Sequence, residues 1–170
     1  NRGNIIIGGN IGKNKNTPLE KANTDYLISF DYLFDYVDYF AVNVSSPNTE
    51  NLRDLQHQDN LKSLLNSIQK NNKSRSQPKP VLLKIAPDLS DVEIESIAAS
   101  LINSKMDGVI ATNTTLSRDA VQGLKHADEM GGLSGSVMTD MSLEVTRKLN
   151  KALDRAIPII GVGGIDSPKA

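Results

Sequence analysis

The sequence predicts an α/β protein with the architecture of a (β/α)8 TIM barrel, of which only about strands 3 to 7 are present. Five apolar, β-branched runs alternate with helical patterns, which indicates parallel βα units. The runs are continuous rather than alternating, as is typical of strands buried on both faces. They span residues 5–12, 39–46, 80–87, 108–115 and 157–165.

An open doubly wound sheet is the competing architecture. Such a sheet concentrates its site at one switch point, whereas a barrel draws functional residues from the ends of many successive strands. Each run here carries its unusual residues toward its C-terminal end. They are Asn10, then Asn43 with Ser46, then Lys84, then residues 112–114, then Gly163 and Gly164. This distribution favours the barrel.

Two helices are predicted among the first three runs. A capping box, TPLE at residues 17–20 with Pro18 at the first helical position, is expected to start the first helix. Its expected apolar face carries Leu27, Phe30, Phe34 and Val37. The second helix has the i, i+3, i+4, i+7 stripe of Leu61, Leu64, Leu65 and Ile68. Residues 69–80, rich in lysine and asparagine, are expected to form a solvated loop.

Two further helices follow the third and fourth runs. A second capping box, SDVE at residues 90–93, starts a helix with Ile94, Ile97, Leu101 and Ile102 as its apolar positions. The last helix follows a GGLSG loop and carries Leu143, Thr146, Leu149 and Leu153. A closed barrel usually takes about 250 residues. We therefore expect residues 1–170 to be part of a single barrel domain of a longer protein.

Composition excludes several classes of function. The net charge is −1, from 19 basic and 20 acidic residues, so nothing indicates an electrostatic nucleic-acid partner. With 0 cysteines the chain has no disulfide, thiolate nucleophile or cysteine-based zinc site, and its 2 histidines lack the spacing of metal ligands. No apolar run approaches the roughly 20 residues of a membrane-spanning helix.

Lys84 lies inside the apolar stretch LLKIAP, in a predicted buried strand. An unpaired buried ammonium is costly, so an anionic partner is expected. That partner is either a carboxylate on a neighbouring strand or a ligand, and we favour the ligand. A cation beside the N1–C2 edge of a flavin, for example, stabilises the anionic reduced ring.

Three loops at strand ends are candidates for a binding site. In ATNTT (111–115), the asparagine side chain offers hydrogen-bond donors and an acceptor, which suits a ligand with alternating C=O and N–H groups. Thr114 and Thr115 are equally compatible with a turn. GGLSG (131–135) and GVGGI (161–165) allow backbone N–H groups to approach a phosphate, as in the last loops of many barrels. Glycine is also simply common in turns.

The stretch NVSSPNT (43–49) places four small polar side chains and a proline where a predicted strand stops. It is either a turn or an active-site loop. Ser46 precedes Pro47, which biases its backbone to extended geometry. In a chain without cysteine or a well-placed histidine, its hydroxyl is the best proton acceptor near such a site. A serine is a weak base, so it needs a relay through water or a neighbouring hydroxyl, for which Thr49 is the candidate.

Taken together, the stretches VNVSSPNTENLRDLQ, LLKIAPDLS, DGVIATNTTLSR, GGLSG and PIIGVGGI resemble the class 2 dihydroorotate dehydrogenases, the quinone-linked FMN enzymes of pyrimidine synthesis. The resemblance runs from about Asn10 to the C-terminus, with the motifs in family order and spacing. The soluble class 1 enzymes place a cysteine where Ser46 stands, so the lack of cysteine agrees with class 2.

The resemblance implies a catalytic role for Ser46, which would take the C5 proton of dihydroorotate while a hydride passes from C6 to flavin N5, giving orotate. The substrate contacts that it implies are Asn43, Asn48, Asn113 and Thr114. The FMN contacts that it implies are Asn10, Asn43, Lys84, Thr112, Gly135 and Gly164, with the two glycines on the phosphate side. A membrane quinone would reoxidise the FMN. The expected location is peripheral to the bacterial inner membrane on its cytoplasmic side, with the mitochondrial inner membrane as the alternative.

Some family features are missing from the sequence: the N-terminal membrane-associated helical element, the early strands and the last barrel strand. The family also has a substrate loop of the form N-R-x-G-F-N-N. We interpret Asn1 and Arg2 as its first residues, joined to Gly3 across a gap, so that Asn1 becomes a further substrate contact. GLSGSV departs from the family's common GLSGxP, which affects the shape of the phosphate loop.

Two other functions stay open. One is a non-catalytic barrel fragment that cannot hold FMN and whose open edge strands make it prone to aggregation. The other is a phosphate-binding barrel lyase, such as an aldolase, in which Lys84 forms a Schiff base. The amide-rich NVSSPNT loop argues against the lyase.

Overall fold

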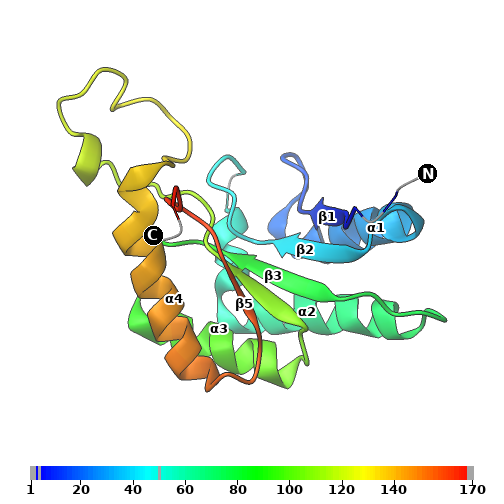
Figure 1. Cartoon of the computed structure of the whole chain (residues 1–170). Coiled ribbons are helices and arrows are strands. Elements are labelled where there is room, and N and C mark those ends of the chain that lie inside the picture. The colour runs from blue at the N-terminus through cyan, green and yellow to red at the C-terminus, as the bar shows by residue number, and fades with distance from the viewer. Residues whose placement is uncertain (1–2, 4, 50, 168–170) are drawn as a thin grey trace.

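The computed structural model describes residues 3, 5–49 and 51–167, and within them one parallel sheet is lined by helices (Figure 1). The strands are β1 (Gly8–Ile11), β2 (Tyr39–Asn43), β3 (Val81–Ile85), β4 (Gly108–Ala111) and β5 (Ile159–Gly161). Their spatial order is β1-β2-β3-β4-β5, and each neighbouring pair is parallel. A doubly wound sheet reverses direction at a switch point. This sheet does not, so it is an arc of a (β/α)8 barrel, as predicted.

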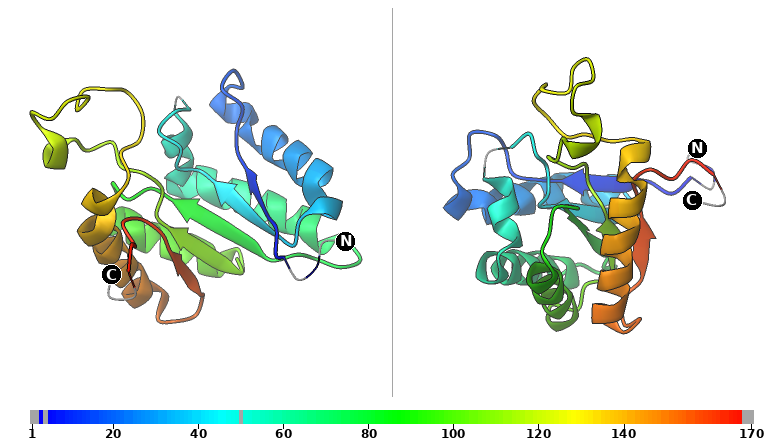
Figure 2. Two further views of the ribbon diagram at one scale, coloured as in Figure 1. Left: turned by 45° about the horizontal axis from the view of Figure 1, so that its top comes forward. Right: turned by 90° about the vertical axis from the view of Figure 1, so that its left-hand side faces the viewer.

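The four α-helices connect successive strands, and each packs against the next along the sheet. They are α1 (Ala22–Leu33), α2 (Gln58–Lys73), α3 (Asp91–Asn103) and α4 (Thr139–Leu153). Figure 2 shows that the strands follow one another in chain order from blue to red. It also shows that the long loop between β4 and α4, drawn in yellow-green, projects away from the sheet. None of the helices in the described part is both long and apolar enough to cross a bilayer.

The two faces of the sheet bury different amounts of apolar surface. Alternate strand residues such as Phe40, Leu83 and Val109 pack against the helices in the main core, which includes Phe30 and Leu64. Each such side chain contributes about 1.5–3 kcal/mol when fully buried. The opposite face carries a smaller cluster of Ala41, Leu82 and Ile110, with Tyr39 against it. This second face would be the barrel interior.

The predicted capping box at residues 17–20 is wrong. Pro18 has an extended ψ of 151° and no side-chain cap is present; a 3-10 turn, η1 (Leu19–Lys21), comes first and α1 begins only at Ala22. The Lys13 ammonium donates to the carbonyls of Asn14 and Thr17 at 3.0 and 2.7 Å, so local side-chain contacts hold this segment as a turn. The expected face of the first helix also shifts. Its buried residues are Ala22, Tyr26 and Phe30, and Val37 lies beyond the helix end.

The second capping box is confirmed. The Ser90 hydroxyl accepts the Glu93 amide at 3.4 Å, while the Glu93 carboxylate accepts the Ser90 amide at 2.8 Å. Hydrogen bonds from the Ser90 hydroxyl and amide also hold the pKa of Glu93 below its usual value. Of the apolar positions expected for this helix, only Ile102 is exposed.

Three further expectations need correction. Residues 69–73 belong to α2 rather than to a loop, because Gln69 and Asn72 bury their amides against the backbone of Lys105 and Lys79. The buried face of α4 is Ser142, Val145, Leu149 and Leu153, so Leu143 and Thr146 lie beside it.

The strands are not all buried on both faces: β1 alternates between exposed and buried, and β5 is largely exposed. In the described part, each of these two strands has a neighbour on only one side.

Candidate active site

Predicted site residues meet on the face of the sheet opposite to the helices. Asn43, the last residue of β2, lies directly beside Lys84 of β3 in the parallel register. Asn10 of β1 lies beside Ala41, which has the same orientation as Asn43 two residues later. Three residues that are far apart in the sequence therefore share one surface toward the carboxyl ends of the strands.

The Lys84 side chain is half-buried at this surface. Within the described residues its ammonium makes no hydrogen bond or ion pair, and its own carbonyl accepts the Ser45 hydroxyl at 2.9 Å. The alternative of an ion pair with a neighbouring strand is thus not realised in the described part of the chain. A ligand as the anionic partner stays a prediction.

Ser45 is the buried centre of a polar cluster and is 0% exposed. Its hydroxyl lies 3.0 Å from Asn43 Oδ1 and accepts Asn113 Nδ2 at 3.1 Å. Asn43 Oδ1 also accepts the Ser45 amide at 3.1 Å and Asn113 Nδ2 at 3.3 Å. These contacts fix which way the Asn43 amide points. Its Nδ2 donates to no other described residue, so it is available to a ligand.

Asn113 and the two threonines beside it are engaged within the protein. Asn113 Oδ1 accepts the Thr114 amide at 2.9 Å. Thr112 is 2% exposed; its amide donates to the Val162 carbonyl at 2.8 Å and its hydroxyl to the Asn113 carbonyl at 2.9 Å. Asn113 therefore orients Asn43, and any ligand contact of the Thr112 hydroxyl uses its oxygen as an acceptor.

The Ser46 loop begins directly after β2, three residues earlier than the end of the predicted strand. The half-buried Ser46 hydroxyl accepts the Asn48 amide at 3.3 Å. The Asn48 side chain is exposed on this loop. Thr49, the candidate relay, makes no hydrogen bond to Ser46 in the described residues. Within the described residues, the candidate base therefore stands at a strand end without a protein acceptor for its proton.

The two glycine-rich loops meet at the start of α4. The Thr139 hydroxyl donates to the Gly164 carbonyl at 2.8 Å, and the Ser142 hydroxyl donates to the Gly163 carbonyl at 2.7 Å. Gly164 has φ +70°, and a Cβ there would lie only 2.5 Å from the Thr139 amide nitrogen. Gly135, at φ +99°, leads through the 3-10 turn η5 (Ser136–Met138) into the same helix. The dipole of α4 makes such a terminus suited to a phosphate.

The GGLSG loop also touches the Ser46 loop. A Cβ at Gly132 would collide with the Thr114 side chain and lie 2.9 Å from Pro47 Cγ. Leu133 and Thr115 exchange backbone hydrogen bonds of 2.8 and 3.1 Å. The predicted base loop, substrate loop and phosphate loop are therefore in contact.

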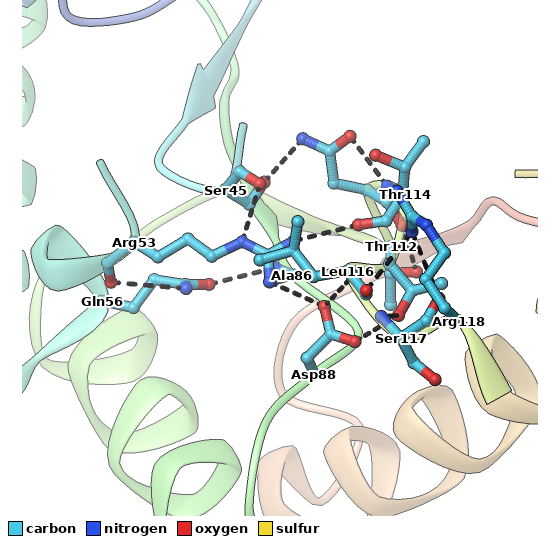
Figure 3. A network of polar contacts seen from close by, with 12 residues as sticks. Ser45, Arg53, Gln56, Ala86, Asp88, Thr112, Thr114, Leu116, Ser117 and Arg118 are labelled. Atoms are coloured by element: carbon cyan, nitrogen blue, oxygen red, sulfur yellow. Dashed lines mark hydrogen bonds and ion pairs between the residues drawn. The ribbon is translucent and has the colours of Figure 1, made fainter. Parts of the chain in front are cut away.

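Sequence reasoning missed three residues that hold this site. Tyr26 of α1 is fully buried and donates its hydroxyl to the Asn43 carbonyl at 2.7 Å, and burial raises its pKa. Arg53 and Asp88 form an ion pair of 2.7 Å beside the Ser46 loop (Figure 3). No local feature of the sequence distinguishes Arg53, which lies in the mixed stretch NLRDLQ (51–56). Nothing in the sequence around Asp88 marks it as the partner of Arg53. In the described residues, no three acidic or histidine side chains cluster as metal ligands.

Comparisons of sequence and of structure agree on one family. Residues 1–169 match the family model described as dihydroorotate dehydrogenase. A protein of Christiangramia forsetii named dihydroorotate dehydrogenase (quinone) is 57% identical over 162 residues, which are 95% of this chain and 47% of the relative. A protein of the same name from Vibrio atlanticus is 55% identical over 95% of this chain and 49% of its own. The chain spans about half the length of the curated relatives it matches.

A solved structure is similar in fold. Ligand-free DHODH from Eimeria tenella superimposes with a TM-score of 0.89 and 34% identity, over 95% of this chain and 48% of that one. Likeness at this level covers the whole arc of strands and helices described above.

Proposed function

This chain belongs to the dihydroorotate dehydrogenase family, and we propose that the protein oxidises (S)-dihydroorotate to orotate in de novo UMP biosynthesis. FMN would be the hydride acceptor and a membrane quinone the final electron acceptor. The observation that carries the proposal is the grouping at the strand ends of the Ser46 hydroxyl, the available Asn43 donor and the Lys84 ammonium, which has no partner in the described residues.

The residues fit FMN at both of its ends. On the ring side we assign Asn10, Asn43, Lys84 and Thr112. The Lys84 ammonium supplies the positive charge, and the Asn43 Nδ2 supplies a donor. On the phosphate side we assign Gly135 and Gly164. At Gly164 the backbone comes so close to Thr139 that a Cβ would not fit. Held by these residues, FMN would supply the acceptor for the hydride that leaves C6 of the substrate.

The substrate would lie under the Ser46 loop. We assign its polar contacts to Asn43, Asn48, Asn113 and Thr114. Asn1, a further assignment, lies outside the described residues. The C5 proton goes to the Ser46 oxygen, whose own hydrogen passes to water, since no hydroxyl of the described residues bonds to Ser46. The electron pair left on C5 forms the C5=C6 double bond as the hydride departs from C6.

A quinone acceptor implies a location at a membrane. We propose a position peripheral to the bacterial inner membrane on its cytoplasmic side, because the two relatives compared above are bacterial proteins named for quinone. We also propose that residues 1–170 belong to a single FMN-binding barrel domain. The near-neutral charge and the amide-rich site favour a small-molecule substrate over a nucleic acid.

A visible spectrum before and after anaerobic addition of dihydroorotate tests the proposal. We expect a yellow flavin spectrum that bleaches on addition. A yellow protein that does not bleach would support flavin binding but contradict dihydroorotate as the substrate. A colourless protein of the intact mass expected for its gene would contradict the proposal as a whole.

A further inference from the structure

The guanidinium of Arg53 connects the ends of three neighbouring strands (Figure 3). Its Nη1 pairs with Asp88 Oδ2 at 2.7 Å, in the segment after β3. Its Nη2 donates to the Thr114 carbonyl at 3.0 Å, after β4, and its Nε donates to the Ser45 carbonyl at 3.4 Å, after β2. Arg53 itself lies in the 3-10 turn η3 (Leu52–Gln56), which follows the Ser46 loop.

The carboxylate of Asp88 extends this connection along the loop after β4. It accepts the Thr115 hydroxyl and the Leu116 amide, the latter at 3.3 Å. The side chains of Arg53 and Asp88 are only 20% and 25% exposed, so the pair is partly shielded from solvent. One ion pair therefore joins the loop that carries the candidate base to the loop that carries two proposed substrate contacts.

We propose that Arg53 and Asp88 are a positioning pair that sets the orientation of Ser46 toward the substrate. The Ser45 carbonyl belongs to the peptide group that joins Ser45 to Ser46. A hydrogen bond to that oxygen restrains the orientation of this peptide plane, and with it the direction of the Ser46 side chain. The same guanidinium holds the carbonyl of Thr114. This inference rests on the proposed function, since it assigns a role within that reaction.

The chemistry of arginine suits this task better than that of lysine. Arginine presents five N–H donors in a rigid plane and can bond three acceptors in different directions at once. The lysine ammonium is a compact point charge on a flexible stem, and could keep the contact with Asp88 while losing one or both carbonyls. Because a misplacement of about 1 Å can cost about a hundredfold in rate, the loss of those carbonyl contacts should appear in the chemical step.

The test compares Arg53→Lys and Asp88→Asn with wild type in the flavin-loaded protein. Arg75→Lys is the matched control, because Arg75 forms a comparable ion pair with Asp31, outside the Ser46 loop and the strand ends that Arg53 joins. We expect flavin content within about twofold of wild type, but flavin reduction by saturating dihydroorotate slower by about ten- to a hundredfold in the two site variants only. We also expect the isotope effect of C5-deuterated substrate to rise, because proton removal becomes more limiting.

A purely structural role would give a different pattern. All three variants would then lower the thermal midpoint or the flavin content, while reduction rate and isotope effect stayed at wild-type values. That result would overturn the inference. In the double variant, Arg53→Lys with Asp88→Asn, we expect no greater loss than in the slower single variant, since the two residues act as a unit.

Hydrogen exchange of residues 44–57 separates this inference from the proposed function. We expect faster amide exchange there in Arg53→Lys than in Arg75→Lys, whatever the substrate proves to be. If wild-type protein is not reduced by dihydroorotate, the proposed function fails and exchange alone decides whether the pair orders the loop. Unchanged exchange in both variants would refute the positioning role.

Discussion

Ser45 and Ser46 are adjacent in the chain but occupy opposite environments. The Ser45 hydroxyl is completely buried and lies 2.9 Å from the Lys84 carbonyl. The Ser46 hydroxyl is half-buried and accepts the Asn48 amide at 3.3 Å. Of these two neighbouring serines, only Ser46 keeps a side chain that is partly exposed to solvent.

Replacement of the candidate base should affect chemistry alone. In Ser46→Ala we expect flavin to remain bound and its reduction by dihydroorotate to slow by about 10²–10⁴, the usual contribution of a general base. Rapid-mixing absorbance measurements under anaerobic conditions give this rate. Wild-type reduction kinetics in the variant would remove Ser46 from the mechanism.

Replacement of the neighbouring serine should affect stability instead. In Ser45→Ala the Asn113 Nδ2 loses a buried acceptor, which should cost about 1–3 kcal/mol of unfolding free energy. Urea unfolding of Ser45→Ala beside Ser46→Ala measures the difference. Equal stabilities of the two variants would contradict the assignment of Ser45 as the centre of the polar cluster.

Lys84 should contribute to flavin affinity through its charge. We expect Lys84→Met to weaken FMN binding by about ten- to a hundredfold, because hydrogen bonds to charged groups contribute about 1.5–3 kcal/mol. Fluorescence titration of flavin-free protein measures the affinity, with Lys62→Met, an exposed position on α2, as control. Equal affinities would contradict the cofactor role. Borohydride trapping of a substrate on Lys84 would support the lyase alternative instead.

Gly164 should tolerate no side chain. Alanine at φ +70° and in contact with the Thr139 backbone is expected to cost about 1–3 kcal/mol and to weaken FMN binding on its phosphate side. At Gly161 a Cβ would lie 3.8 Å from its nearest neighbour, a methyl of Ile165, so Gly161→Ala is the matched control. Thermal unfolding and flavin titration test both. Similar behaviour of the two variants would argue against a tight loop at Gly164.

Tyr26 should make stability depend on alkaline pH. Burial, together with the charge of Asp25, raises its pKa above the ordinary value of about 10, although a hydrogen bond from the Lys13 backbone opposes this. A raised folded-state pKa means that the contribution is full below about pH 10 and is lost as pH rises further, because the unfolded phenol ionises first. Tyr26→Phe should cost about 0.5–1.5 kcal/mol at neutral pH.

Urea unfolding from about pH 8 to pH 11 checks this expectation. The free-energy difference between wild type and Tyr26→Phe should shrink across the upper part of that range. Comparison of the two proteins removes the contribution of the other tyrosines and lysines. A difference that stays constant with pH would show that the Tyr26 phenol does not ionise differently on unfolding.

Local sequence was sufficient to predict the five strands, the four helices between them and the edge at which the candidate site lies, although not every helix boundary. The stripe of Leu61, Leu64, Leu65 and Ile68 appears as the buried face of α2, because a helix repeats its environment every 3.6 residues. Parallel strands bring their carboxyl ends to one edge. Polar residues late in each apolar run, such as Asn43 and Lys84, could therefore be placed together before any coordinates were known.

Only the tertiary structure decided which polar atoms at that edge are available to a ligand and which are bonded within the protein. Arg53 and Asp88 are 35 residues apart, and Tyr26 is 17 residues from the carbonyl that it bonds. Periodicity reports the environment of a residue but carries no information about its partner across the fold. The sequence by itself therefore determined the arc of strands and the edge that carries the candidate site, and long-range hydrogen bonds determined the orientation of the groups on it.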